Sequence, residues 1–297
     1  MKNRLLKRQY AVAVGKHTDY ADLGRQTFKV IKNGMNYWAA DPFPIEKDGT
    51  LYIFAEIFEY SKNKGSIGYT KLEKDKFTPW KIVIQESYHL SFPNLLYKDD
   101  ELFMCPEANE SGSIYLYKCI EFPEIWKKDR VLVSSGNYAD TIFYGQNKET
   151  YGITFKLSDA GNRIELFKLH NSETVFSDME VRSDGPDYTR PAGNIFYDDH
   201  NKCLLLPTQI GVPEYGSGIM MNEFSVDWPY MEIRPLGKIY PKDLNYTQTK
   251  DYVGIHTLNF TENYVVVDLK WYGFNAVNLF FKFLRWINRE RERDGKR

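Results

Sequence analysis

A unit made of two short apolar strands joined by a polar turn recurs along this chain of 297 residues. In the first copy, the acidic residue Asp41 precedes the strand, and an acidic residue, Glu56, ends the second strand. The landmark residues of the five copies are Asp41, Phe92, Asp140, Arg190 and His256, which lie about 50 to 65 residues apart. Repeats of this length are typical of β-propeller blades, which have four strands each. The sequence therefore predicts an all-β protein, a five-bladed β-propeller.

The alternative is another all-β fold in which strand–turn–strand pairs recur without radial order. The propeller is favoured because the landmark falls just before the first strand in each copy. Equivalent positions of blades face one central axis, so we expect the landmark side chains to converge on a single funnel.

Aromatic residues make up 16% of the chain, with 22 Tyr, 19 Phe and 6 Trp. Large aromatic side chains suit the pleated surfaces of sheets. A second interpretation is carbohydrate binding, because the apolar faces of sugar rings stack on aromatic rings. The two interpretations are compatible.

The charge balance argues against nucleic acid as a partner, because the net charge is −1 and a phosphate-binding protein normally carries a basic excess. The three cysteines, Cys105, Cys119 and Cys203, form no close-spaced pair, which fits a reducing compartment. The first ten residues lack the apolar run of a signal peptide. No stretch has the roughly 20 apolar residues of a membrane-spanning helix. We expect a cytoplasmic protein, located at the inner face of a membrane if the C-terminal segment binds lipid.

The C-terminal segment differs from the rest of the chain, because residues 275–289 have helical periodicity. We expect a propeller over residues 1–273 and an amphipathic helix with a charged tail over 274–297. One interpretation is that the apolar face of this helix packs against the propeller. The other is an in-plane membrane helix, for which the polar stripe of Asn278, Lys282, Arg285 and Arg289 suits anionic lipid.

Four carboxylic acids stand beside apolar strands, where partial burial separates pKa values: Asp41, Glu56, Glu107 and Asp140. Glycosyl chemistry uses two carboxyl groups that flank the bond being broken. One protonates the leaving oxygen, and the other activates the incoming group or attacks the sugar. These acids are the candidate catalytic residues.

Other polar and aromatic residues are candidates for substrate binding. Arg190 could clamp a phosphate or hydroxyl, or could simply pair with an acid at the surface. His256 and His89 could contact a sugar or phosphate, or could be hydrogen-bonded core residues. The remaining candidates are Trp38, Glu56, Gln209 and Tyr215. Asp198 and Asp199 are expected in a solvated turn.

Several cofactor signals are missing from the sequence. It contains no Gly-rich phosphate loop after a strand, no zinc-spaced Cys/His cluster, no Asp-x-Asp and no Gly-x-Ser-x-Gly elbow. We therefore expect neither a metal nor a cofactor.

A series of short motifs resembles a known family. In chain order they are Ala40-Asp41-Pro42-Phe43, Phe54-Ala55-Glu56, Gly65-Ser66-Ile67-Gly68, His89-Leu90-Ser91-Phe92-Pro93, Cys105-Pro106-Glu107, Phe122-Pro123-Glu124-Ile125-Trp126, Ala139-Asp140-Thr141-Ile142-Phe143, Arg190-Pro191-Ala192-Gly193, Gln209 with Tyr215-Gly216, and His256-Thr257. Over roughly residues 30–270 the chain resembles the five-bladed propeller of glucosamine inositolphosphorylceramide transferases and of bacterial polysaccharide-biosynthesis proteins. That propeller is similar to those of glycoside hydrolase families 43 and 32.

The resemblance implies a catalytic trio. Its members would be Asp41 in the first blade, Asp140 as the acid that tunes and orients, and Glu107 as the proton donor. The order in this chain departs from the hydrolases, in which the glutamic acid usually comes last.

These observations lead to three functional hypotheses. The first is a glycosyltransferase of surface-polysaccharide or glycolipid assembly, which takes a sugar or nucleotide sugar and a glycan or lipid-linked acceptor. The second is an intracellular glycoside hydrolase that uses the same carboxyl groups with water. The third is a propeller that binds glycans without catalysis.

Overall fold

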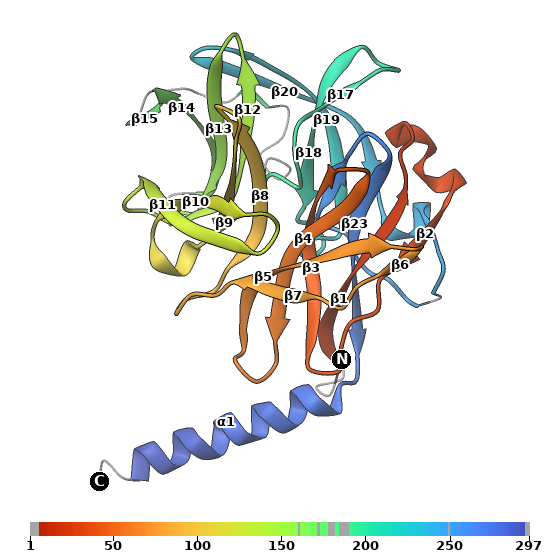
Figure 1. Ribbon diagram of the computed structural model, residues 1–297, viewed down its shortest axis with the longest axis vertical. Coiled ribbons are helices and arrows are strands. Elements are labelled where there is room, and N and C mark those ends of the chain that lie inside the picture. Colours follow the sequence, from red (N-terminus) through yellow and green to blue (C-terminus); the bar gives the residue numbers. More distant parts are fainter. Residues whose placement is uncertain are drawn as a thin grey trace.

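The computed structural model describes residues 6–159, 161–170, 173–177, 182–183, 190–248 and 250–294. Five separate sheets are arranged as the blades of a propeller, and a single α-helix follows the last blade in the described part of the chain (Figure 1). The predicted five-bladed propeller with a C-terminal helix is confirmed.

Blades 1 to 3 each use consecutive strands, with the first strand innermost. Blade 1 contains β3 (Tyr37–Lys47), β4 (Thr50–Glu59), β5 (Lys64–Glu73), β6 (Lys76–Phe77) and β7 (Lys81–Ile84). Blade 2 contains β8 (Ser91–Lys98), β9 (Glu101–Glu107), β10 (Ile114–Glu121) and β11 (Ile125–Val133). Blade 3 contains β12 (Tyr138–Gln146), β13 (Glu149–Lys156), β14 (Arg163–His170) and β15 (Glu173–Phe176).

Blade 4 is built from β17 (Phe196–Asp198), β18 (Cys203–Ile210), β19 (Gly218–Asp227) and β20 (Tyr230–Ile239), with β16 (Arg182–Ser183) added parallel to β20. Short 3-10 turns connect other strands: η1 (Tyr20–Arg25), η2 (Asn109–Ser111) and η4 (Pro241–Asp243). Asp198 is buried and accepts hydrogen bonds from the backbone and side chain of Asn201, so the expectation that it is solvated is wrong. It stabilises the β17–β18 turn.

Blade 5 joins the two ends of the chain. Its strands are β22 (Leu258–Phe260), β23 (Tyr264–Gly273), β1 (Lys7–Lys16), β2 (Thr27–Val30) and β21 (Asn245–Tyr246). β1 pairs with β23 over its whole length, from Lys7 opposite Gly273 to Lys16 opposite Tyr264. The ring is therefore closed by hydrogen bonds between the first and last strands, which fixes the blades around one axis.

The inner strands of blades 1, 2 and 3 share a bulge at the same position. Asp41, Phe92 and Asp140 have φ angles of 51°, 44° and 49°, and each lies at a register shift between the first two strands of its blade. Such a bulge turns a strand sharply and re-aims a side chain. The landmark in blade 2 is apolar, because Phe92 is fully buried and packs edge-on against Phe43. The polar landmark of that blade is therefore missing from the inner strand.

Asparagines connect the inner segments of four blades. Asn94 of β8 donates to the side chain of Asn194 at 2.5 Å, and the Asn194 backbone N–H donates to the side chain of Asn259 at 2.7 Å. Asn259 in turn donates to the carbonyl of Pro42 at 2.9 Å. Blades 2, 4, 5 and 1 thus meet at the axis, as the repeat pattern predicts.

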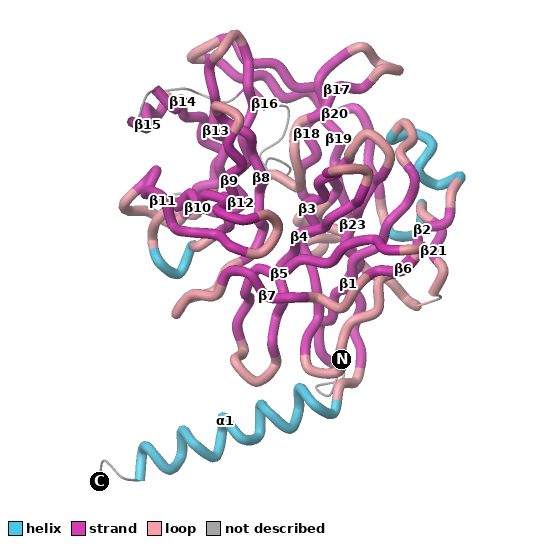
Figure 2. Tube along the Cα trace, in the orientation of Figure 1, coloured by secondary structure: helices cyan, strands magenta, loops and turns pink. Residues whose placement is uncertain are grey.

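The helix α1 (Ala276–Asp294) extends from the end of β23 and lies beside the propeller rather than on it (Figure 2). Asn275 caps it by accepting a hydrogen bond from the Asn278 N–H at 2.9 Å. Among the described residues, no helix combines the length and the apolar character that crossing a membrane requires.

Candidate functional site

The bulges and the strands that follow them bring charged side chains together at one end of the propeller axis. Glu56 lies opposite Ala40, the residue before the first bulge, and Glu107 lies opposite Ser91, the residue before the second. Glu56 and Glu107 are thus equivalent in neighbouring blades. The name axial cluster is used below for Asp41, Glu107, Asp140, Arg190, Gln209, His256 and Asp268.

One half of the axial cluster is centred on Arg190. Its Nε donates to Oδ2 of Asp140 at 2.5 Å, and its Nη2 lies 3.3 Å from Oε2 of Glu107. Gln209 donates from Nε2 to the same oxygen of Asp140 at 2.6 Å. The side chains of Arg190 and Glu107 are 21% and 14% exposed, whereas that of Asp140 is 4% exposed. Solvent therefore reaches Arg190 and Glu107 but hardly reaches Asp140.

The surroundings of Glu107 and Asp140 shift their pKa values in opposite directions. Burial, together with the negative charge of Asp140, raises the pKa of Glu107 well above its usual range. Burial also acts to raise the pKa of Asp140, but the adjacent Arg190 guanidinium outweighs it and lowers that pKa. The raised pKa favours a protonated Glu107 carboxyl, which can donate a hydrogen bond to the Asp140 carboxylate. The opposite shifts thus favour a proton on the more exposed of the two carboxyl groups.

The other half of the axial cluster is centred on Asp41. Thr257 donates to its Oδ1 at 2.9 Å, and the Phe92 backbone N–H donates to its Oδ2 at 3.2 Å. The His256 ring places Nε2 3.6 Å from Oδ1 of Asp41, while its Nδ1 forms a close ion pair with Asp268. Asp268 also accepts backbone hydrogen bonds from His256 and Thr257, at 2.9 and 3.1 Å. Asp268 thus orients the ring toward Asp41.

Burial and neighbouring charges both shift the pKa values in this half of the axial cluster. It raises the pKa of Asp41 to about 7, helped by Glu56 and Asp268 and opposed by His256. Burial acts to lower the pKa of His256, but the charge of Asp268 and then that of Asp41 outweigh it and raise the value to about 9. Asp41 can therefore exchange a proton near neutral pH beside a charged imidazole.

Among the described residues, one set of side chains offers donor atoms close enough to hold a metal ion. These are Asp41, His256 and Asp268, whose donor atoms lie within 4.8 Å of one another. Each already has a partner within the set or from neighbouring N–H and hydroxyl groups. A cation here would have to displace the His256 ring from Asp268.

A second pair, His89 and Glu56, lies beside the axial cluster. His89 Nε2 is 3.2 Å from Oε1 of Glu56, and the Gly65 N–H donates to His89 Nδ1 at 3.0 Å. Burial lowers the pKa of His89, but the hydrogen bond and the charge of Glu56 reverse the shift and raise it. The pair is therefore a polar group on the blade 1 side of the axial cluster.

Aromatic rings surround the charged groups. Tyr215 lies under the Arg190 guanidinium, 4.9 Å from ring centroid to Cζ, and meets the His256 ring edge-on at 5.4 Å. Tyr10 stacks on His256 at 5.0 Å, and Trp38 packs against Tyr10 at 4.9 Å. Trp38 therefore packs against Tyr10, and it is Tyr10 that contacts His256 of the axial cluster.

The side chain of Gln209 has a hydrogen-bond acceptor, Oε1, that is not used within the site. Its side-chain nitrogen is used by Asp140 and by the Pro191 carbonyl, at 2.6 and 3.0 Å. Its buried Oε1 has no hydrogen-bond partner among the described residues. A buried oxygen of this kind can accept a hydrogen bond from a hydroxyl group of a bound molecule.

Sequence reasoning missed three members of this arrangement: Asp268, Thr257 and Tyr10. A signal for Asp268 was present in the sequence, because this acid directly follows an apolar run, as Glu56 and Glu107 do in blades 1 and 2. Tyr10 had no local signal. It reaches the axial cluster only because β1, near the start of the chain, pairs with β23, near its end.

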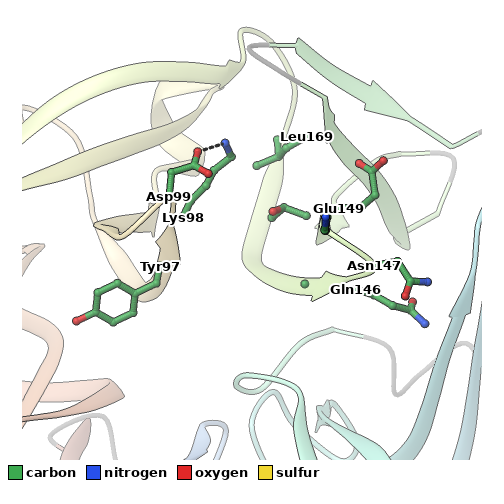
Figure 3. Close-up of a pocket in the computed structure, with 10 residues that line it drawn as sticks. Tyr97, Lys98, Asp99, Gln146, Asn147, Glu149 and Leu169 are labelled. Atoms are coloured by element: carbon green, nitrogen blue, oxygen red, sulfur yellow. Dashed lines mark hydrogen bonds and ion pairs between the residues drawn. The ribbon is translucent and has the colours of Figure 1, made fainter.

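Figure 3 shows a surface cleft of about 690 Å³, and no residue of the axial cluster lines it. It is lined by Tyr97, Lys98 and Asp99 at the β8–β9 turn and by residues 145–150 at the β12–β13 turn. These turns end the inner strands that begin at the axial cluster, so the cleft opens at the other end of the blades. None of the predicted site residues lines it.

A protein-family model described as "Glucosamine inositolphosphorylceramide transferase 1, N-terminal" matches residues 28–182 of this chain. The glucosamine inositolphosphorylceramide transferase 1 of Arabidopsis thaliana is 36% identical over 108 residues, which are 35% of this chain and 14% of that protein. Its counterpart in Oryza sativa subsp. indica is 32% identical over 99 residues, which are 32% of this chain and 13% of that protein. The match thus spans about a seventh of each of these relatives.

The fold is similar to those of solved glycoside hydrolase structures. A β-xylosidase superposes with a TM-score of 0.57 at 11% sequence identity, covering 79% of this chain and 92% of that one. The native arabinanase of Bacillus subtilis superposes with a TM-score of 0.51 at 14% identity, covering 80% of this chain and 95% of that one. At these identities the likeness concerns the fold alone.

Proposed function

Because this chain belongs to the glucosamine inositolphosphorylceramide transferase 1 N-terminal family, we propose that it transfers a sugar residue to a lipid-linked acceptor in glycolipid or surface-polysaccharide synthesis. The named relatives are transferases whose acceptor carries an inositol phosphate on a lipid. An activated sugar, such as a nucleotide sugar, would be the donor.

One observation carries the proposal: Glu107, whose pKa is raised, lies beside Asp140, whose pKa is lowered and which Arg190 and Gln209 hold in place. Two acids with separated pKa values are the usual basis of acid–base catalysis at a glycosidic carbon. Glu107 would give its proton to the leaving oxygen as the bond between that oxygen and the anomeric carbon breaks. Asp140 would position Glu107, and Arg190 would stabilise the Glu107 anion afterwards.

Asp41 would act as the general base. With a pKa of about 7, it can accept the proton of the acceptor hydroxyl as that oxygen bonds to the anomeric carbon. His256, held by Asp268, would stabilise the charge on Asp41 before the reaction. Gln209 Oε1, Tyr215 and His89 would contact sugar hydroxyls or ring faces. One proton is taken up at Asp41 and one is released from Glu107, so the proton balance closes.

A glycoside hydrolase is the second candidate, favoured by the shared propeller fold and by the same pair of acids. In that case water would replace the acceptor hydroxyl at Asp41. The chemistry at Glu107 would be unchanged, so the acceptor distinguishes the two candidates.

The test is to incubate the purified chain with UDP-N-acetylglucosamine or UDP-glucose, with and without detergent-solubilised inositolphosphoceramide. Transfer predicts UDP release that depends on the acceptor and a labelled lipid product. Turnover of nitrophenyl glycosides in water, without use of the nucleotide sugar, would favour the hydrolase. Saturable glycan binding with neither reaction would indicate a binding module and contradict the proposal.

A further inference from the structure

The helix α1 presents its apolar face away from the propeller. Phe280, Phe283 and Trp286 are 57%, 55% and 57% exposed, and Leu284 is exposed as well. With 3.6 residues per turn, these positions lie on one side of the helix, opposite Asn278 and Arg285. These four side chains therefore do not pack against the propeller.

The polar side of the helix makes the contacts with the propeller. Arg285 donates to the carbonyl of Tyr60 at 2.5 Å, and it also contacts Ser61 and Asn63 of the β4–β5 turn. Asn275 donates to the Tyr60 hydroxyl at 3.2 Å. These bonds fix which face of the helix points outward, because rotating the helix to bury its aromatic side chains would break them.

The helix is attached at the same end of the blades as the axial cluster. Leu258 pairs with Val267, so the last residues of β23 lie beside His256, which precedes β22. The other anchor, Tyr60, follows β4, and Glu59 at the end of β4 pairs with Tyr37 at the start of β3, just before Asp41. Both anchors of α1 therefore belong to the end of the propeller where the carboxyl groups gather.

The charges near the exposed face are positive. Residues 274–288 contain no Asp or Glu, and their two cations are Lys282, which flanks this face, and Arg285 on the propeller side of the helix. Lys7 at the start of β1 lies beside Lys282, so burial and the neighbouring charge lower the pKa of Lys7. Arg8 next to it is exposed. A helix with an aromatic apolar face and flanking cations is typical of segments that lie in a membrane interface.

We propose that the face formed by Phe280, Phe283, Leu284 and Trp286 rests on an anionic lipid surface and turns the axial-cluster end of the propeller toward it. A second copy of the chain fits less well. Two such faces would bring Lys282, Lys7 and Arg8 of both copies together, and the acids of α1 come only at Glu290 and beyond, two turns after Lys282. Lipid phosphates supply the missing negative charge. The inference concerns binding and holds whichever reaction the axial cluster performs.

The test is co-sedimentation of the full chain with phosphatidylcholine vesicles, with and without phosphatidylglycerol. Binding is expected to the anionic vesicles and to weaken as salt is raised. The double variant Phe283→Ser/Trp286→Ser should lower the binding constant by at least about tenfold. Tyr97→Ser is the matched control, because Tyr97 is 62% exposed at the other end of the blades. It should bind as the wild type does.

Two further measurements keep the outcome clear. Thermal unfolding of the double variant should match the wild type, because the substituted side chains are exposed. Glu107→Gln should bind vesicles normally, which separates lipid binding from catalysis. Failure of the wild type to bind anionic vesicles, equal binding by the double variant, or a dimer in light scattering that the double variant dissociates would each overturn the inference.

Discussion

Arg190 and Asp140 form an ion pair across the axial cluster, with Nε of the guanidinium 2.5 Å from Oδ2 of the carboxylate. The two residues come from blades 4 and 3, so their contact ties neighbouring blades together at the axis. It also sets the proton on Glu107, because an ionised Asp140 disfavours a second negative charge beside it.

Removing the Arg190 guanidinium should lower the free energy of unfolding. Arg190→Met leaves a buried carboxylate without its partner, which costs about 3 kcal/mol of unfolding free energy. Urea unfolding measures the change. The control is Arg234→Met, which breaks an ion pair with Glu223 in which the arginine side chain is 67% exposed, and it should cost no more than about 1 kcal/mol. Equal losses in the two variants would contradict the described pairing.

The His256–Asp268 pair predicts that the propeller is less stable in alkali. A histidine whose pKa is raised by folding contributes stability that is complete below pH 6.5 and is lost as pH rises through about 9. The loss from this group should reach about 3 kcal/mol. Asp41 acts in the same direction at lower pH, because its raised pKa makes stability fall between about pH 4 and pH 7.

Unfolding of the wild type and of His256→Gln at pH 6.5 and pH 9 tests this dependence. The variant should be less stable than the wild type at pH 6.5, with a smaller difference at pH 9. His200→Gln is the control, since His200 is exposed in the β17–β18 turn. A pH profile unchanged in His256→Gln would contradict the buried ion pair.

The backbone at Asp41 predicts which substitutions the bulge accepts. Its φ of 51° is in the left-handed region, which asparagine adopts readily and β-branched residues do not. Asp41→Asn should therefore keep the fold and lose transfer activity by at least about 100-fold, while Asp41→Val should destabilise the protein. Circular dichroism with an activity assay distinguishes the two effects. Full activity in Asp41→Asn would exclude Asp41 as the base.

Gly193 allows two inner segments to approach closely. Its φ is 155°, and a Cβ atom there would lie 2.0 Å from the carbonyl oxygen of Leu258. Gly193→Ala should cost about 3 kcal/mol, because backbone in blade 5 would have to move. Gly211→Ala is the control, since its Cβ would meet nothing within 4 Å. Thermal unfolding should separate the two variants, and similar stabilities would contradict the packing of these blades.

The repeat pattern predicted the parts of the fold that are local in sequence. Each blade's first two strands and the bulge residues Asp41 and Asp140 could be found from spacing, because one unit contains its own turn. The pairing of β1 with β23 could not, because it joins residues at opposite ends of the chain and leaves no local signal. For the same reason Tyr10 was not expected beside His256.

The candidate site was predicted in part. The motifs indicated Arg190, Asp140 and Glu107, which the structure brings into contact. The spacing placed the apolar Phe92 at the landmark position of blade 2, and the carboxyl group of this blade, Glu107, comes from the end of its second strand. The amphipathic pattern of α1 also could not predict how the helix is oriented. Such a pattern tells which side chains share a face but not which face the propeller covers.

The central claim is that Glu107 supplies the proton for sugar transfer, and the most direct test compares Glu107→Gln with the wild type in the acceptor-dependent reaction. The amide keeps the size and a hydrogen-bond donor but has no acidic proton, so the account predicts a kcat at least about 100-fold lower with an unchanged KM for the nucleotide sugar. Glu101→Gln, at an exposed position of the same blade, should keep its activity. A Glu107→Gln variant as active as the wild type would contradict the account.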